Sequence, residues 1–175
     1  MTTTQLSKPD LDLTQIINGE EIMAPSPFGI HQRISHNLDI EISLFLRRKP
    51  IGSLFAAPLD VIFEEGINQV QPDLIFIKKE NMGIFHEHGW IRGVPDLLIE
   101  VVSKGTITRD TEEKYEIYQK YGVSEYWLVF PEQQCIEVYT LENSIYTIYC
   151  STERTNGKVV SKILTGFELD SNLIF

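Results

Sequence analysis

Two carboxylates and one lysine have the types and spacing needed for metal-dependent chemistry on a phosphate. The stretch GVPDLLIEVVS at 93–103 has the composition of a buried strand, yet it carries Glu100 among aliphatic residues. Burying an unpaired carboxylate is energetically costly, so Glu100 requires a cationic partner. A second apolar run, QPDLIFIKK at 71–79, has Asp73 near its start.

The two runs predict an antiparallel pair joined by the loop 80–93. In the register that centres this loop, Asp73 lies opposite Glu100, and directly opposed Cβ atoms are about 4.5–5.5 Å apart. Two carboxylates at that separation repel each other unless a cation lies between them, and Mg²⁺ is commonly held by one or two carboxylates. Structural ion pairs with arginine or lysine are the alternative, which Asp96 at the strand entry fits better.

Lys114 lies on a predicted helix over 108–123. It precedes Tyr118 by four positions, so both residues share one stripe of that helix. Helical side chains lean toward the N-terminus, which directs Lys114 back toward Glu100. An exposed pair with Asp110, worth about 0.3–0.5 kcal/mol, is the alternative.

The apolar patterning predicts the elements that position these residues. Helices are expected over 31–48 and 108–123, and strands over 53–65, 71–79, 95–103, 125–131, 135–143 and 144–152. Two short strands joined by a turn at Asn18-Gly19 are expected within 16–29. This order predicts an α/β fold with one central mixed sheet covered by helices. Residues 1–15 are polar and expected to be flexible, whereas 16–175 are expected to form a single domain.

The composition restricts the class of protein. The chain has 175 residues, of which 42% are hydrophobic and 23% are charged, as in soluble globular proteins. It has no apolar run long enough for a membrane span and no signal-peptide pattern, so we expect a cytoplasmic location. The net charge of −10 argues against coating of nucleic acid by bulk electrostatics but allows a local basic patch.

A set of motifs resembles a known family. The segments QPDLIFI, PDLLIEVVS, RDTEEKYEIYQKYGVSEYWLVF and IEVYTL together resemble the Uma-two family of restriction-endonuclease-like proteins, in the PD-(D/E)XK nuclease superfamily. The likeness extends over residues 16–170. It implies a restriction-endonuclease-like core of helix, three strands, helix and strand, with extra C-terminal strands. It also implies a DNA endonuclease dependent on Mg²⁺ or Mn²⁺. We expect a homodimer, because one small domain of this type cuts one strand.

The resemblance assigns roles residue by residue. The superfamily's metal-binding aspartate falls on Asp73, the acidic residue of its second motif on Glu100, and an extra metal ligand on the backbone carbonyl near Val101. The motif lysine belongs two positions after Glu100, where this chain has Val102. The chain thus resembles superfamily members in which that lysine has moved to the following helix, where Lys114 stands. Asp73, Glu100 and Lys114 are the predicted catalytic residues.

The departure at Val102 leaves a second hypothesis open, that of a catalytically degraded nuclease-fold protein acting as a binding or assembly module. Contact of Lys114 with Asp73 and Glu100 would favour the endonuclease hypothesis, and exposure of Lys114 to solvent would favour the binding or assembly module. Three other polar residues are weaker site candidates: Glu41 as an additional acid of the first helix, Asp60 as a further carboxylate, and His31 as a phosphate contact.

Overall fold

A mixed sheet of six strands forms the centre of the molecule. The computed structural model describes residues 13–23, 28–153 and 156–175. The strand order is β11-β10-β9-β8-β6-β3, in which β8 and β9 are parallel and every other pair is antiparallel. The strands are β3 (Gly52–Ala56), β6 (Leu74–Lys78), β8 (Leu97–Val101), β9 (Glu125–Phe130), β10 (Cys135–Glu142) and β11 (Ile145–Ser151). The predicted α/β class is confirmed.

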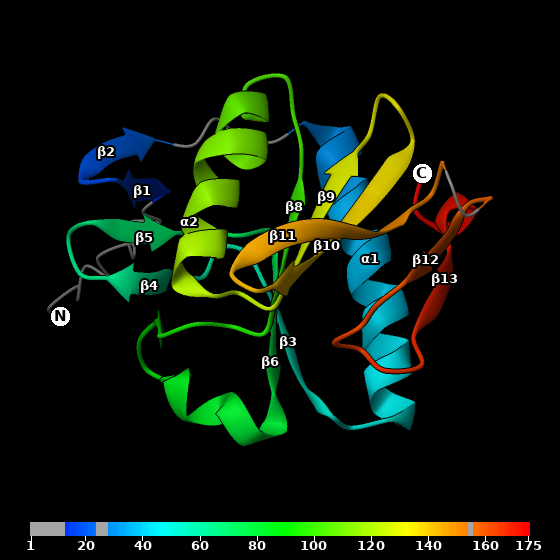
Figure 1. Ribbon diagram of the computed structural model, residues 1–175, viewed down its shortest axis with the longest axis horizontal. Coiled ribbons are helices and arrows are strands. Elements are labelled where there is room, and N and C mark those ends of the chain that lie inside the picture. Colours follow the sequence, from blue (N-terminus) through cyan, green and yellow to red (C-terminus); the bar gives the residue numbers. More distant parts are fainter. Residues whose placement is uncertain (1–12, 24–27, 154–155) are drawn as a thin grey trace, which may run out of the picture.

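Two helices cover opposite faces of this sheet (Figure 1). Helix α1 (Gly29–Arg48) buries one side chain per turn against one face, namely Ile34, Leu38, Ile42 and Leu46. Helix α2 (Lys114–Tyr121), which follows one π-helical turn η2 (Arg109–Glu113), packs Ile117 and Tyr118 against the other face. None of the described helices is long and apolar enough to cross a membrane.

The connection from β8 through α2 to β9 is the parallel crossover of the fold. Two parallel strands require such a connection, because a tight hairpin can join only antiparallel strands. Helix α2 ends at Gly122, whose φ of 87° lies in the left-handed region that glycine adopts without strain. The crossover thereby brings the N-terminal end of α2 to the carboxyl end of β8.

The predicted central mixed sheet is present, and the described residues form two further sheets beside it. A five-stranded sheet has the order β2-β1-β5-β4-β7, and a two-stranded sheet joins β12 to β13. Their strands are β1 (Thr14–Ile17), β2 (Glu20–Met23), β4 (Val61–Glu64), β5 (Asn68–Val70), β7 (Ile91–Arg92), β12 (Lys158–Val160) and β13 (Glu168–Asp170). Two 3₁₀ helices, η1 (Lys79–Ile84) and η3 (Ser171–Leu173), complete the described elements.

The predicted strand over 53–65 is divided between two sheets for a local reason. Its first part is β3 in the central sheet and its second part is β4 in the five-stranded sheet. Pro58 lies between them and has no backbone N–H with which to continue a ladder. Of the predicted flexible segment 1–15, residues 1–12 lie outside the described residues, whereas Thr14 and Gln15 belong to β1.

The predicted register of the two strands that carry the carboxylates is confirmed. Leu74 of β6 pairs with Ile99 of β8, so the next position outward places Asp73 opposite Glu100. The connection between the strands is more elaborate than a simple loop, because it contains η1 and the short strand β7. Asp73 and Glu100 therefore lie at one end of the central sheet.

Candidate active site

Asp73 is held at the end of β6 by contacts with two other elements. Its Oδ2 accepts a hydrogen bond of 2.7 Å from the backbone N–H of Val101 on β8 and lies 3.1 Å from Nε2 of His31 on α1. The sequence suggested His31 as a phosphate contact, and its Nδ1 atom is buried and has no hydrogen-bond partner within the described part of the chain. The first turns of α1 thus contribute to the same site as the strand ends.

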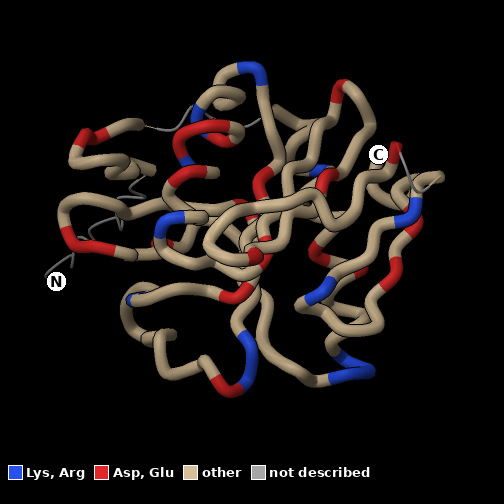
Figure 2. Tube along the Cα trace, in the orientation of Figure 1, with Lys and Arg blue, Asp and Glu red and all other residues tan. Residues whose placement is uncertain are grey.

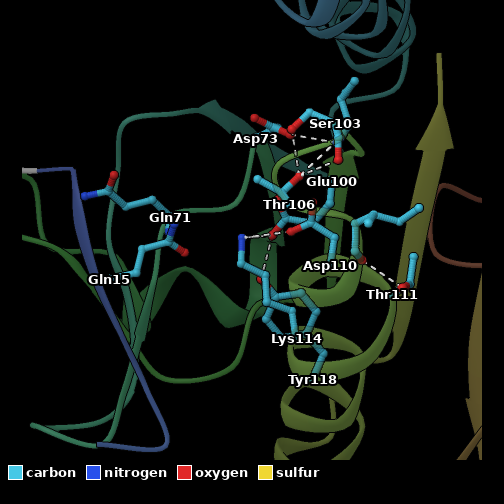
Figure 3. Close-up of polar contacts among 12 residues, drawn as sticks. Gln15, Gln71, Asp73, Glu100, Ser103, Thr106, Asp110, Thr111, Lys114 and Tyr118 are labelled. Atoms are coloured by element: carbon cyan, nitrogen blue, oxygen red, sulfur yellow. Dashed lines mark hydrogen bonds and ion pairs between the residues drawn. The ribbon is translucent and has the colours of Figure 1, made fainter. Parts of the chain in front are cut away.

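Glu100 accepts hydrogen bonds from two side chains of α2. Its Oε1 accepts from Nζ of Lys114 at 2.8 Å and from the hydroxyl of Tyr118 at 2.7 Å. Lys114 is only 3% exposed. The exposed pair with Asp110 considered above is therefore excluded, and the predicted reach of Lys114 back to Glu100 is present (Figure 3).

Asp110 is a third carboxylate of the cluster. It is buried on the π-helical turn, with its Oδ1 3.6 Å from Nζ of Lys114, and it is also hydrogen-bonded by Thr106. Lys114 therefore lies between two acidic side chains that approach it from a strand and from its own helix. Asp110 precedes Lys114 by four positions, and this spacing was the sequence signal that could have placed it in the site.

Burial dominates the electrostatics of the cluster. Burial raises the pKa of Glu100 to about 8, with Asp110 and Asp73 adding to the rise and Lys114 opposing it. Burial likewise raises the pKa of Asp110. For Lys114, burial lowers the pKa, but the charges of Glu100 and Asp110 outweigh it and the net pKa is raised. Burial also lowers the pKa of His31, and its hydrogen bond with Asp73 makes the net pKa higher than usual. Lys114 therefore keeps its positive charge, whereas the neighbouring carboxyl groups of Glu100 and Asp110 bind protons more readily than usual.

The cluster lies in the wall of a cavity of about 660 Å³. Two amide side chains, Gln15 of β1 and Gln71 beside β5, line the cavity as well, and Figure 3 shows them to one side of the carboxylates and Lys114. The cavity is also lined by Leu13, Phe28, His31, Gln32, Ala57, Pro58, Val101, Ser103, Lys104, Gly105, Thr106 and Arg109. This volume exceeds that of a hydrated metal ion and leaves room for part of a substrate.

The donors of the cluster suit a hard divalent cation. One oxygen of each predicted metal ligand, Oδ1 of Asp73 and Oε2 of Glu100, has no partner among the described residues. Mg²⁺ and Mn²⁺ prefer such oxygen donors, and Mg²⁺ is typically held by only one or two carboxylates. Within the described ranges, no group of three or more His, Cys, Asp or Glu side chains forms a metal site. The residues present therefore fit a two-carboxylate site.

Other polar residues considered from the sequence lie elsewhere. Asp96 has a local structural role, because it accepts hydrogen bonds from the N–H of Lys78 and the amide of Asn81. Asp60 is bonded to Gln71 at 2.7 Å. Glu41 is not among the residues that line the cavity. The contacts of Asp96 and Asp60 therefore agree with structural roles for both residues.

Val102, at the position expected for the motif lysine, belongs to the apolar core. It is 6% exposed and packs in the cluster of side chains between α2 and the sheet. Because side chains alternate along a strand, a residue two positions after Glu100 shares its side of the sheet. In this chain Lys114, on α2, places its ammonium group on that side of the sheet instead.

The fold and the site together define an α/β protein of the nuclease-fold class, with an acid and lysine cluster at one end of its sheet. The family model Uma2, described as "Putative restriction endonuclease", matches residues 4–172, and the chain therefore belongs to that family.

A solved structure is similar over nearly the whole chain. It is described as the crystal structure of a putative nuclease belonging to DUF820 from Anabaena variabilis. The two sequences are 22% identical, the match covers 93% of this chain and 89% of that one, and the TM-score is 0.74. This likeness supports the fold. The comparison with curated proteins finds no match.

Proposed function

We propose that this protein is a metal-dependent DNA endonuclease that hydrolyses phosphodiester bonds. The observation that carries the proposal is the meeting of Asp73, Glu100 and buried Lys114 in the wall of one cavity. Each carboxylate has one oxygen with no partner among the residues that the structure describes, and such an oxygen is available to coordinate Mg²⁺ or Mn²⁺. The membership in a family described as restriction endonucleases supports the same chemistry.

In this proposal Asp73 and Glu100 hold the cation, with the backbone carbonyl of Val101 as a further ligand. When bound, a divalent ion polarises the phosphoryl group and lowers the pKa of the attacking water. Lys114 stabilises the negative charge that develops on the phosphate, and its contact with Glu100 fixes its position. His31 orients Asp73 by donating from Nε2.

The distribution of charge supports a local interaction with nucleic acid. Figure 2 shows acidic and basic residues interspersed along the chain, whose net charge is −10. Basic residues also occur on the connection between β8 and α2, where Lys104 and Arg109 line the cavity. Substrate affinity would then depend on the bound cation and these few residues, since bulk attraction is absent. Two copies, one for each strand, would act on duplex DNA.

The test is cleavage of supercoiled plasmid in Mg²⁺ or Mn²⁺. We expect nicked or linear product from the wild type, and none from Glu100→Gln, which removes one carboxylate charge from the cation site. Glu116→Gln is the matched control, because Glu116 is exposed on the same helix that carries Lys114. Loss of activity in both variants would contradict a specific role for Glu100.

The degraded nuclease fold is a second candidate, favoured by Val102 at the motif position and by the net charge of −10. It predicts that DNA binds and is not cut in any divalent metal. Folded wild-type protein that binds DNA without cleaving it in Mg²⁺, Mn²⁺ or Co²⁺ would replace the enzyme by the binding module.

A further inference from the structure

Arg109 has an unusual environment for an arginine. Its Nη1 atom is buried, yet it has no hydrogen-bond partner among the described residues, and the side chain lines the cavity that contains Asp73, Glu100 and Lys114. Arginine is always charged and carries five N–H donors. A buried donor without an acceptor is unfavourable, and such groups in folded proteins call for an explanation.

The neighbouring acids do not provide the missing acceptor. Asp110 interacts with Lys114 and Thr106, and Glu100 accepts from Lys114 and Tyr118. The structure contains no hydrogen bond or ion pair between Arg109 and these carboxylates within the described residues, although its charge acts on Asp110 through space. The guanidinium is therefore held close to the acidic cluster and remains available to another anion.

A phosphate diester is the anion that best fits this position. The guanidinium fork matches two oxygens of a phosphate, and such charge-assisted pairs are both shorter and stronger than neutral hydrogen bonds. A divalent cation on Asp73 and Glu100 would draw the scissile phosphate into the same cavity. Lys104 is less suited to this role than Arg109, because its side chain is 81% exposed and its Nζ already lies 3.1 Å from a carboxylate oxygen of Glu132.

We propose that Arg109 is the phosphate-binding residue of the site, and that it donates hydrogen bonds to the non-bridging oxygens of a nucleic-acid phosphate. This inference rests on the proposed function, because it takes the substrate of that cavity to be a phosphodiester. It assigns Arg109 to substrate binding, whereas Lys114 acts on the charge that develops during cleavage.

The test measures binding separately from cleavage. Fluorescein-labelled DNA duplexes of differing base composition are titrated with protein in Ca²⁺ and followed by fluorescence anisotropy. Ca²⁺ also binds oxygen ligands but is larger than Mg²⁺ and coordinates in a different geometry, so the cation site stays intact, and gel electrophoresis checks that the DNA is not cut during the titration. Arg109→Ala and Arg109→Lys are compared with the wild-type parent and with Arg47→Ala, which removes the same charge from an exposed position in the last turn of α1. Thermal unfolding of each variant reports whether it remains folded.

Arg109→Ala is expected to weaken binding about 10- to 100-fold, the range for loss of a charge-assisted hydrogen bond, and by the same factor on every sequence. The slope of log K against log salt should fall by about one. Arg109→Lys, which retains the charge without the fork, should lie between the alanine variant and the parent. Arg47→Ala should bind like the parent.

Different failures separate the two proposals. If folded Arg109 variants bind like the parent while the wild type cleaves DNA, the phosphate assignment is wrong and the endonuclease proposal stands. If the loss of affinity depends on base sequence, Arg109 reads bases and the assignment is also wrong. If the wild type never cleaves but Arg109→Ala weakens binding uniformly, the phosphate assignment stands and the catalytic proposal fails.

Discussion

Two glutamates are buried near opposite ends of the parallel strands β8 and β9, and their partners differ in kind. Glu125, at the start of β9, is fully buried and accepts four hydrogen bonds. The donors are the indole of Trp127 at 2.7 Å, the hydroxyl of Ser161 at 2.6 Å, and the backbone N–H groups of Lys162 at 2.7 Å and Ile163 at 3.0 Å. Both of its oxygens are therefore used.

Glu100, near the end of β8, has both of its bonds on a single oxygen. Lys114 and Tyr118 donate to Oε1, while Oε2 has no partner among the described residues and the side chain lines the cavity. The comparison shows that burial alone does not distinguish a structural carboxylate from a functional candidate. The distribution of donors over the two oxygens does so, because a ligand can bind only at an oxygen that the protein leaves available.

The largest expected effect follows from removing the ammonium group of Lys114 at the end of β8 that borders the cavity. Lys114→Ala would leave Glu100 and Asp110 buried without their shared ammonium, which we expect to lower the free energy of unfolding by about 3–5 kcal/mol. We also expect cleavage to fall about 10²–10³-fold, the scale of losing one charge-stabilising donor. Urea unfolding and plasmid cleavage measure the two losses.

The matched control for Lys114 is Lys120→Ala, because Lys120 is exposed on the same helix and its Nζ lies over the ring of Tyr121, 5.0 Å from the ring centroid. Lys120→Ala should change stability and cleavage little. A Lys114→Ala protein that cuts DNA at the wild-type rate would exclude the migrated-lysine hypothesis.

Substitution of Glu125, at the start of β9, should lower stability without changing activity. Glu125→Ala leaves four donors without their acceptor, two in buried and two in partly buried hydrogen bonds, and we expect a loss of at least about 3 kcal/mol in the free energy of unfolding. Cleavage per folded molecule should be unchanged, because Glu125 does not line the cavity. Glu125→Gln retains one acceptor oxygen and should lose less. A Glu125→Ala protein that is fully folded but inactive would contradict this division of roles.

The smallest expected effect is a pH dependence of stability in metal-free protein. The pKa of Glu100 rises from 4.5 to about 8 on folding. Between these values the folded protein retains a proton that the unfolded chain has released, so stability falls as the pH rises through this range. The raised pKa of His31 acts in the same direction, since its contribution is present below the unfolded pKa and is lost as the pH rises through the folded pKa.

Urea unfolding at about pH 6 and about pH 8, with and without Mg²⁺, measures this dependence. Mg²⁺ should stabilise the folded protein more at the higher pH, because the cation and the proton compete for Glu100 and the cation binds only the folded site. Burial also raises the pKa of Glu125, so Glu100→Gln is the control that isolates Glu100. A metal-free stability that increases between these pH values would contradict the raised pKa.

Much of the central sheet could be predicted from the sequence because its strands are short apolar runs with clear ends. The register of Asp73 and Glu100 followed from loop length alone, and the structure has that register. The five-stranded sheet was predicted only in part, because the two short strands within 16–29 and the run that ends in β4 were expected as strands, whereas β5, β7 and the assembly into a separate sheet were not. Its strands, such as β5 (Asn68–Val70) and β7 (Ile91–Arg92), have only three and two residues and carry too little periodicity to be recognised.

The site was predictable where chain spacing determined it and unpredictable where packing did. The contact of Lys114 with Glu100 followed from the stripe shared with Tyr118. The burial of Asp110 and the contact of His31 with Asp73 depend on how the turn before α2 and the start of α1 pack against the strand ends. No local pattern reports such packing, because the elements involved are distant in the chain.

The crossover described above also affects how the site assembles during folding. The partners of Glu100 lie only 14 and 18 positions further along the chain, so their loops close at low entropic cost. We expect this contact to form early, together with β8 and α2, because local contacts form faster than distant ones. Local unfolding of α2 would then separate the buried charges, whereas opening of the five-stranded sheet would leave them together.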